Sequence, residues 1–171
     1  MDVKYINPFI SSLNNTLETM LSVSPGRNQP FLKSNNKASG DVSGIIGFAS
    51  QEVVGSVALT FPEKAALKAY ELLMGETLPH INEEVQDMVG ELANIVAGGA
   101  KEEFNAIGIV YHISIPTVVT GKGHSIGHKG GVPVVVIPFE LNGLPFYMEV
   151  SMKVKPGQPT LQKLVAENVA G

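Results

Sequence analysis

The stretch from Ile81 to Asn105 constrains the fold of this chain more than any other segment. Its apolar residues recur at intervals of three and four: Val85, Met88, Val89, Leu92, Ile95, Val96 and Phe104. Successive residues of an α-helix are rotated by about 100°, so this spacing gathers the apolar residues into one stripe. We therefore predict one long helix whose apolar stripe is buried in a core, with Met88, Leu92 and Ile95 among the buried residues.

A second face of this predicted helix is polar. Asp87, Glu91, Asn94 and Gly98 stand at i, i+4, i+7 and i+11, which places them in one row roughly 130° away from the apolar stripe. A face built only for solubility commonly mixes Lys with Glu at i, i+4, but no cation appears here before Lys101. Periodicity alone still favours a solvated helix face for this row.

Small side chains flank the polar row: Gly90, Ala93, Ala97 and Ala100. They would allow another backbone to approach the helix closely. Each glycine inside a helix costs about 1 kcal/mol of helix propensity relative to alanine, and Gly98 and Gly99 add to that cost. A purely structural role explains these glycines poorly, so we expect this side of the helix to make a close contact.

Two further helices are predicted. The first spans residues 7–21, with Asn7 as its N-cap and Pro8 at its first helical position. Its expected buried stripe comprises Phe9, Leu13, Leu17, Met20 and Leu21. The second opens at Pro62-Glu63 and is closed by Gly75.

Strand patterns fill most of the remaining chain. They cover residues 29–34, 41–48, 53–61, 109–120, 132–140 and 144–154. The runs 41–48 and 53–61 are predicted to form an antiparallel hairpin. Asn142-Gly143, between the last two runs, is the strongest hairpin signal in the sequence.

This order of elements predicts an α+β domain of two main layers, in which the helices cover a mainly antiparallel sheet. The succession of helix, strands and hairpin occurs once before and once after residue 80, so the fold is expected to be internally duplicated. A chain of 171 residues suffices for one domain with a full core. We predict a single domain over 1–154 and a C-terminal tail over 155–171, to which no function is assigned.

Composition narrows the classes of partner. The chain has no cysteine and no tryptophan, and 16 acidic residues against 12 basic ones give a net charge of −4. Without a basic cluster, a nucleic-acid partner is not expected. No apolar run approaches the ~18 residues of a membrane helix, and the N-terminus does not resemble a secretion signal. We therefore expect no membrane association, a location in the cytoplasm, and a protein partner.

Three other patterns are candidate sites. His124 and His128 have a metal-compatible spacing for a helix, but they lie in a glycine-rich stretch that favours a flexible hairpin loop. No metal site is predicted there. Ser43 has no histidine or lysine nearby in sequence to activate it, so a nucleophile is not expected. Gly44 and Gly47 lie inside a strand, where glycine typically marks a bulge or a close backbone crossing.

The spacing Asp-x-x-x-Glu-x-x-Asn-x-x-x-Gly at Asp87, Glu91, Asn94 and Gly98 resembles the signature of the CheC/CheX/FliY family of chemotaxis phosphatases. The segments 40–48, 55–59 and 115–121 also resemble CheX, and the likeness covers about residues 3–154. The resemblance implies the CheC-like two-layer fold.

The predicted first helix carries no second copy of this signature. Ser11 could hold its first position, but Asn15 stands where Glu is expected and Glu18 where Asn is expected. One site is therefore expected, as in the CheX branch of the family.

The same resemblance implies a function. Asn94 would enter the active site of a phosphorylated CheY-like response regulator and orient the attacking water, while Glu91 would pair with a lysine of that regulator. Asp87 and Gly98 would support the helix and its fit. The phosphorylated aspartate and Mg²⁺ belong to the regulator, so no cofactor is expected in this chain.

Two alternatives stay open. The chain could be a non-catalytic adaptor in chemotaxis or in the flagellar switch, using the same helix only for docking. CheX-type relatives form homodimers by joining their sheets, and the apolar run 132–137 could supply the edge strand or could instead be a buried central strand.

Overall fold

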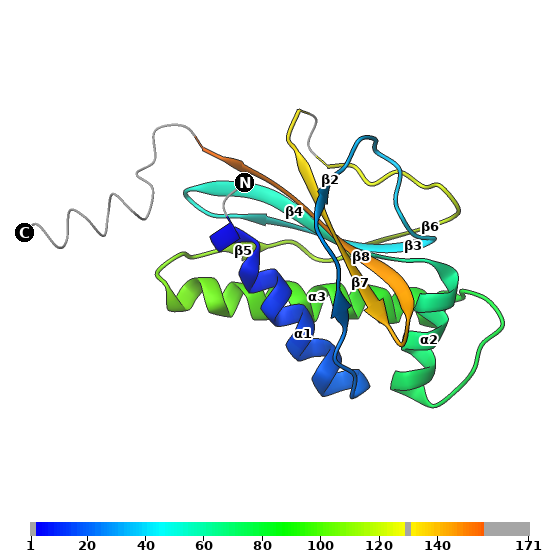
Figure 1. The fold of residues 1–171 in the computed structure, drawn as a ribbon. Coiled ribbons are helices and arrows are strands. Elements are labelled where there is room, and N and C mark those ends of the chain that lie inside the picture. Colours follow the sequence, from blue (N-terminus) through cyan, green and yellow to red (C-terminus); the bar gives the residue numbers. More distant parts are fainter. Residues whose placement is uncertain (1–2, 129–130, 156–171) are drawn as a thin grey trace, which may run out of the picture.

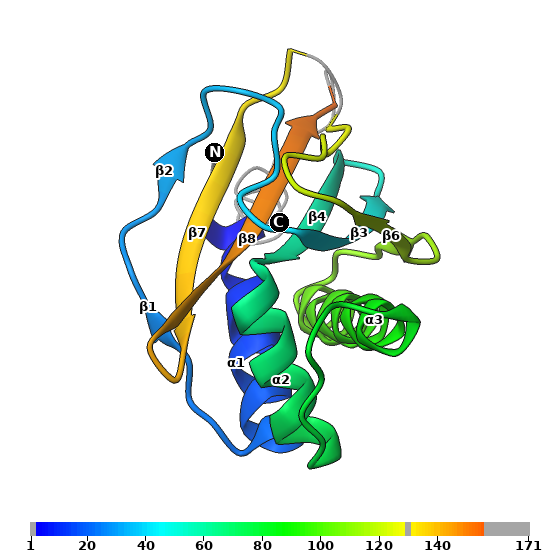
Figure 2. The same cartoon turned by 90° about the vertical axis from the view of Figure 1, so that its right-hand side faces the viewer.

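A computed structural model describes residues 3–128 and 131–155. Within them, three α-helices pack on one face of an eight-stranded sheet (Figures 1 and 2). The helical segments are a 3-10 turn (Val3–Tyr5), α1 (Asn7–Leu21), α2 (Glu63–Met74) and α3 (Glu83–Ala106). The strands are β1 (Gly26–Arg27), β2 (Phe31–Leu32), β3 (Val42–Ala49), β4 (Val53–Phe61), β5 (His112–Ile113), β6 (Thr117–Thr120), β7 (Val134–Leu141) and β8 (Leu144–Val154). None of the described helices combines the length and hydropathy that a bilayer span requires.

The sheet confirms the predicted α+β class with antiparallel pairing. Its order is β1-β7-β8-β4-β3-β5, with β2 also pairing with β7 and β6 with β3. The same succession, a long helix, two short strands and a hairpin, occurs from α1 to β4 and again from α3 to β8. The short strands of each half pair with the hairpin of the other half, β1 and β2 with β7, and β5 and β6 with β3. The two halves of the duplication are thereby interlocked.

The two hairpins form as predicted. β3 pairs with β4 from Val42↔Phe61 to Ala49↔Val54, and β7 pairs with β8 up to Leu141↔Leu144. Between the latter two residues, Asn142 and Gly143 both have positive φ, 50° and 76°. This is the two-residue turn that Asn-Gly favours, because both residues tolerate the left-handed region.

Three predictions of element boundaries were wrong. The expected strand 109–120 is divided into β5 and β6 at Ile115-Pro116, since proline lacks the N–H that a ladder needs and keeps the preceding residue out of regular pairing. The expected strand 29–34 shrinks to β2. Asn7 is not the N-cap of α1: the cap position is Ile6, without a side-chain hydrogen bond, because the preceding 3-10 turn runs directly into the helix.

The core lies between the helices and the sheet. Its largest fully buried side chains include Phe9 and Leu13 of α1, Leu92 and Phe104 of α3, and Phe61 of β4. Met20 and Ile95 were expected in the core, but both are partly exposed, because they line the open side of the α1–α3 groove.

Gly44 lets α3 lie directly on β3. A Cβ atom at Gly44 would stand 2.8 Å from the carbonyl oxygen of Val89 and 3.0 Å from the Cβ of Ala93. Such separations are below normal van der Waals contact, so only glycine permits this packing distance. The predicted close backbone crossing at Gly44 is thus confirmed. It sets the distance between α3 and the sheet.

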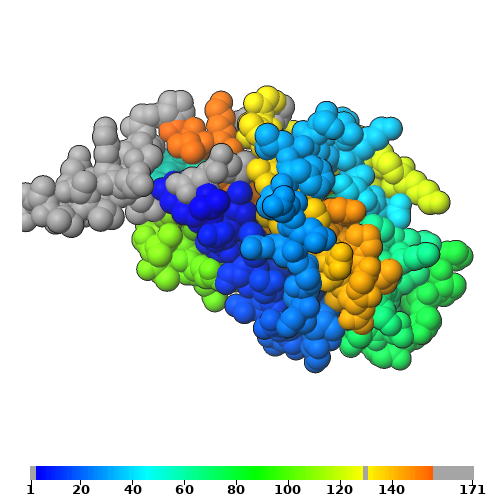
Figure 3. All heavy atoms as spheres, viewed as in Figure 1, coloured from blue at the N-terminus to red at the C-terminus, as the bar shows by residue number. Residues whose placement is uncertain are grey.

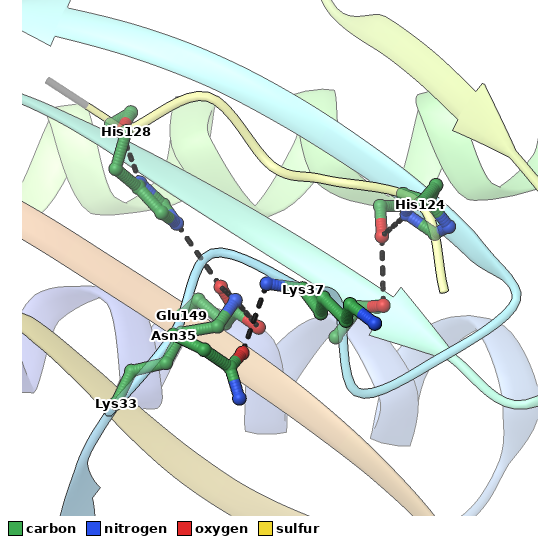
Figure 4. A network of polar contacts seen from close by, with 9 residues as sticks. Lys33, Asn35, Lys37, His124, His128 and Glu149 are labelled. Atoms are coloured by element: carbon green, nitrogen blue, oxygen red, sulfur yellow. Dashed lines mark hydrogen bonds and ion pairs between the residues drawn. The ribbon is translucent and has the colours of Figure 1, made fainter. Parts of the chain in front are cut away.

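The sheet face opposite the helices carries a buried ion network (Figure 4). The Glu149 side chain is fully buried, and its carboxylate lies 2.7 Å from Lys33 Nζ and 3.1 Å from His128 Nε2. His128 Nδ1 also lies 2.8 Å from the Ser56 hydroxyl. Lys33 follows β2 in the segment that links α1 to β3, and Figure 3 shows this segment in lighter blue beside α1. The network therefore fixes two loop segments to the sheet.

The two histidines of the predicted loop both make hydrogen bonds to the sheet within the described residues 121–128. His124 Nε2 lies 2.7 Å from Ser43 Oγ, and its Nδ1 lies 2.7 Å from the carbonyl oxygen of Gly121. Ser43 therefore does have a histidine beside it in space, one that is distant in sequence. Its hydroxyl also contacts Thr60 and is fully buried, so Ser43 joins the loop to the sheet rather than facing a substrate.

β7 is not a free sheet edge. It pairs with β8 on one side and with β1 and β2 on the other. The part of the run 132–137 that lies in β7 is thus covered along this side by the chain's own Phe31, Leu32 and Lys33. The tail predicted over 155–171 lies outside the described residues except for Lys155, whose Nζ donates to the carbonyl oxygen of Ser50.

Candidate functional site

Helix α3 is a rigid platform for the polar row. Asn82 caps it by accepting a hydrogen bond from the backbone N–H of Val85 at 3.0 Å, and Glu83 and Glu84 lie in the first turn, where negative charge favours the helix dipole. The helix continues without interruption to Ala106. Side chains one turn apart on such an element keep fixed relative positions.

The structure brings the predicted residues together on the open side of α3. Asp87 and Glu91 are exposed, and Asn94 and Gly98 are half-buried. Met88 and Leu92 are buried, as predicted. Within the described part of the chain, the carboxylates of Asp87 and Glu91 and the carboxamide of Asn94 make no hydrogen bond or ion pair. These groups are therefore available to a partner without first breaking an internal contact.

The small residues beside the row have a different role from the expected one. Gly90, Ala93, Ala97 and Ala100 are buried, so the close contact they allow is made within this protein. A Cβ atom at Gly90 would stand 3.0 Å from Val118 of β6. Gly98 differs, since a Cβ atom there would meet no atom within 4 Å. Among these positions, Gly98 is the one that leaves open space over the helix.

An apolar recess borders the row on the side of α2. It has a volume of about 350 Å³ and is lined by Met20, Tyr70, Leu73, Met74, Met88 and Leu92, with Glu84, Asp87 and Glu91. The Tyr70 hydroxyl donates to Glu84 Oε2 at 2.8 Å, and this hydrogen bond to a carboxylate, with burial, raises the pKa of Tyr70 to about 12. Sequence analysis missed the recess because its walls come from three helices distant in the chain.

Comparison with known proteins agrees with this arrangement. Residues 42–140, which include β3, α3 and the whole polar row, match the family model described as chemotaxis phosphatase CheX. The chain belongs to this family. One relative of this chain is the CheY-P phosphatase CheX of Thermotoga maritima. The two proteins are 28% identical over 131 residues, which cover 76% of this chain and 84% of that protein.

Solved structures of the CheX and CheC-like type share the fold. The CheC-like superfamily protein from Shewanella sp. PV-4 is 40% identical, with a TM-score of 0.83 over 90% of this chain and 99% of that chain. The CheX-CheY-BeF3-Mg²⁺ complex from Borrelia burgdorferi has a chain 28% identical, with a TM-score of 0.71 over 89% of this chain and 99% of that chain. The CheC-like fold inferred from the signature is thereby confirmed.

α1 carries no equivalent of the CheX row. Asn15 and Glu18 are exposed, and Glu18 accepts a hydrogen bond from Ser24 at 3.1 Å. The Thr16 hydroxyl turns back to the carbonyl oxygen of Ser12. The groove between α1 and α3 is thus lined differently from the surface around Asn94, in keeping with one site in this CheX-family chain.

Proposed function

We propose that this chain is a phosphatase of a phosphorylated CheY-like response regulator. The row formed by Asp87, Glu91, Asn94 and Gly98 would be the surface that binds the regulator and carries the catalytic residues. The observation that carries the proposal is the pairing of an unbonded carboxylate at Glu91 with an unbonded carboxamide at Asn94, one turn apart on the exposed side of a rigid helix in a CheX-family chain. Such a pair can enter a cleft in another protein.

Asn94 would act on the attacking water. Its carboxamide offers one acceptor oxygen and two donor hydrogens, so it can hold a water in line with the aspartyl phosphate of the regulator. The water oxygen bonds to phosphorus as the bond between phosphorus and the aspartyl oxygen breaks. The products are inorganic phosphate and a free carboxylate, and the protons of the water pass to phosphate and solvent. Mg²⁺ on the regulator neutralises charge at this centre.

Glu91 would pair with a cationic side chain of the regulator. Removal of a charged partner at the centre of an interface commonly costs about 2 kcal/mol or more of binding free energy. We therefore expect Glu91→Ala, and also the uncharged Glu91→Gln, to weaken binding of the beryllofluoride-activated regulator, as measured by calorimetry. Glu102→Ala, which removes another exposed acid of α3, is the matched control and should bind like the parent. Equal affinities for all four proteins would contradict this role.

Gly98 would leave room for the regulator. In the free protein Gly98→Ala should be stabilising, because alanine gains about 1 kcal/mol of helix propensity over glycine and the added Cβ meets no atom within 4 Å. The same methyl group should weaken regulator binding. The melting temperature of Gly98→Ala should therefore rise while its affinity for the regulator falls. A stabilised variant with unchanged affinity would show that the regulator does not approach Gly98.

A non-catalytic adaptor is the alternative function. Both functions predict that the regulator binds α3, but only the phosphatase accelerates loss of its phosphoryl group. The deciding experiment measures phosphate release from a phosphorylated CheY-like regulator with and without this protein. Faster release supports the phosphatase, whereas binding without acceleration supports the adaptor.

We also propose a homodimer, with contact at the sheet rim formed by β1 and β2. Phe31 and Leu32 of this rim are adjacent large apolar side chains that are 49% and 68% exposed, so a second copy of the chain could cover them. Sedimentation analysis at micromolar concentration should give the mass of two chains. A single-chain mass under those conditions would contradict the proposal.

A further inference from the structure

The recess between α2 and α3 has an apolar floor that the proposed water-positioning chemistry does not use. Its floor and walls include Met20 from the end of α1, Leu73 and Met74 from the end of α2, and Met88 from α3. Figure 2 shows α2 beside α3 and α1 behind it. Met74 is 60% exposed. Methionine side chains are flexible and polarisable, so a lining rich in methionine adapts to an inserted apolar group.

The charge around this recess has one sign. Glu84, Asp87 and Glu91 line it, and none of its lining residues is a lysine, arginine or histidine. The Tyr70 hydroxyl holds Glu84 in place from the α2 side. An apolar floor with carboxylates around it is complementary to an apolar side chain that stands beside a cationic one.

The recess is continuous with the proposed catalytic row, because Glu91 belongs to both. Asn94 lies three residues beyond Glu91, a rise of about 4.5 Å along a helix. A stable protein interface covers about 800 Å² on each partner. A regulator centred on Asn94 therefore extends over the recess as well.

We propose that this recess is a specificity pocket for the response regulator. It receives an apolar side chain flanked by a lysine or arginine from the regulator surface next to the phosphorylation site. This inference rests on the proposed function for the identity of the partner. It assigns Met74, Leu73 and Met20 to recognition and leaves the reacting atoms to the α3 row.

The pocket acts on binding and not on the chemical step, so its loss separates KM from kcat. Placing a carboxylate in the recess with Met74→Glu should raise KM for the phosphorylated regulator by about tenfold or more, as expected when a buried apolar contact of an interface is lost. The value of kcat should stay within about twofold of the parent. Met74→Leu retains an apolar side chain of similar volume and should restore most of the affinity.

The experiment measures phosphate release over a range of concentrations of phosphorylated CheY-like regulator, for the parent and for both Met74 variants. Val110→Glu is the matched control, since Val110 is 62% exposed but lies beyond the C-terminal end of α3. Thermal melts verify that all variants are folded. A KM for Met74→Glu equal to that of the parent overturns the pocket while leaving the phosphatase function intact.

Binding of the beryllofluoride-activated regulator separates the two proposals further. If the parent binds without accelerating hydrolysis and Met74→Glu binds more weakly, the pocket stands and the phosphatase function fails. If the parent neither binds nor accelerates, both fail.

Binding should also weaken as salt is added, because the acidic rim is screened, and this salt dependence should be shallower for Asp87→Asn. A salt-independent affinity overturns the assignment of a cationic partner group.

Discussion

Asn94→Ala is expected to abolish accelerated dephosphorylation of the regulator while leaving its binding largely intact. The carboxamide acts chiefly in the transition state, and loss of a precisely oriented catalytic contact commonly costs about 100-fold in rate. Because the Asn94 side chain makes no hydrogen bond within the described residues, its removal should barely change the free energy of unfolding. Phosphate release at saturating protein, with binding affinity measured in parallel, tests this expectation.

Asn105→Ala is the matched control for this result. Asn105 is an exposed asparagine on the last turns of the same helix, so its replacement tests whether any exposed amide on α3 would produce the effect. It should retain full activity. An Asn94→Ala protein that retains full activity would show that the catalytic assignment is wrong.

Lys33→Ala should destabilise the fold by about 3 kcal/mol or more, because it leaves a buried carboxylate without its main cationic partner. The Lys33 and Glu149 side chains are 6% and 0% exposed, and they are joined at 2.7 Å. Chemical denaturation measures the effect. Lys68→Ala is the control, since Lys68 pairs with Glu71 at the surface, with side chains 32% and 41% exposed, and such pairs contribute about 0–1 kcal/mol.

The stabilisation from this network should depend on pH. Burial alone raises the pKa of Glu149, but hydrogen bonds from His128 and Lys33, together with their charges, outweigh burial and hold that pKa below its ordinary value. A carboxyl group whose pKa is lowered on folding contributes stability above its unfolded pKa and loses it as pH falls through the folded pKa. The difference between parent and Lys33→Ala should therefore shrink in strong acid. If the difference in unfolding free energy between the two proteins stays constant as the pH is lowered into strong acid, the Glu149 carboxylate is not the source of this stabilisation.

The long helix and its two faces could be predicted from sequence because a period of 3.6 residues sustained from Val85 to Phe104 is a strong local signal. The Asn142-Gly143 turn was predictable for the same kind of reason, since the residues themselves favour its backbone angles. Ile95 was assigned to the core by periodicity, but the open groove beside α1 leaves it partly exposed. Periodicity indicates which side of a helix faces inward without showing how far its neighbours cover it.

Other features depend on contacts between distant residues, which a single sequence does not reveal. The glycines around His124 and His128 predict a flexible loop, but they do not reveal the hydrogen bonds that join this loop to the sheet at Ser43 and Ser56. These hydroxyls precede their histidines by 81 and 72 residues. The apolar recess likewise needs Met20 and Met74 beside Met88, and only the packed helices bring them together.

A crystal structure of this protein bound to a CheY-like regulator that carries beryllofluoride and Mg²⁺ tests the central claim most directly. Beryllofluoride stands for the phosphoryl group of the activated regulator. The account predicts that Asn94 enters the regulator's active site, with its carboxamide within about 3 Å of a water or a fluoride at the phosphoryl position, and that Glu91 contacts a cationic side chain of the regulator. A complex in which the regulator occupies another surface, with Asn94 remaining in solvent, would contradict it.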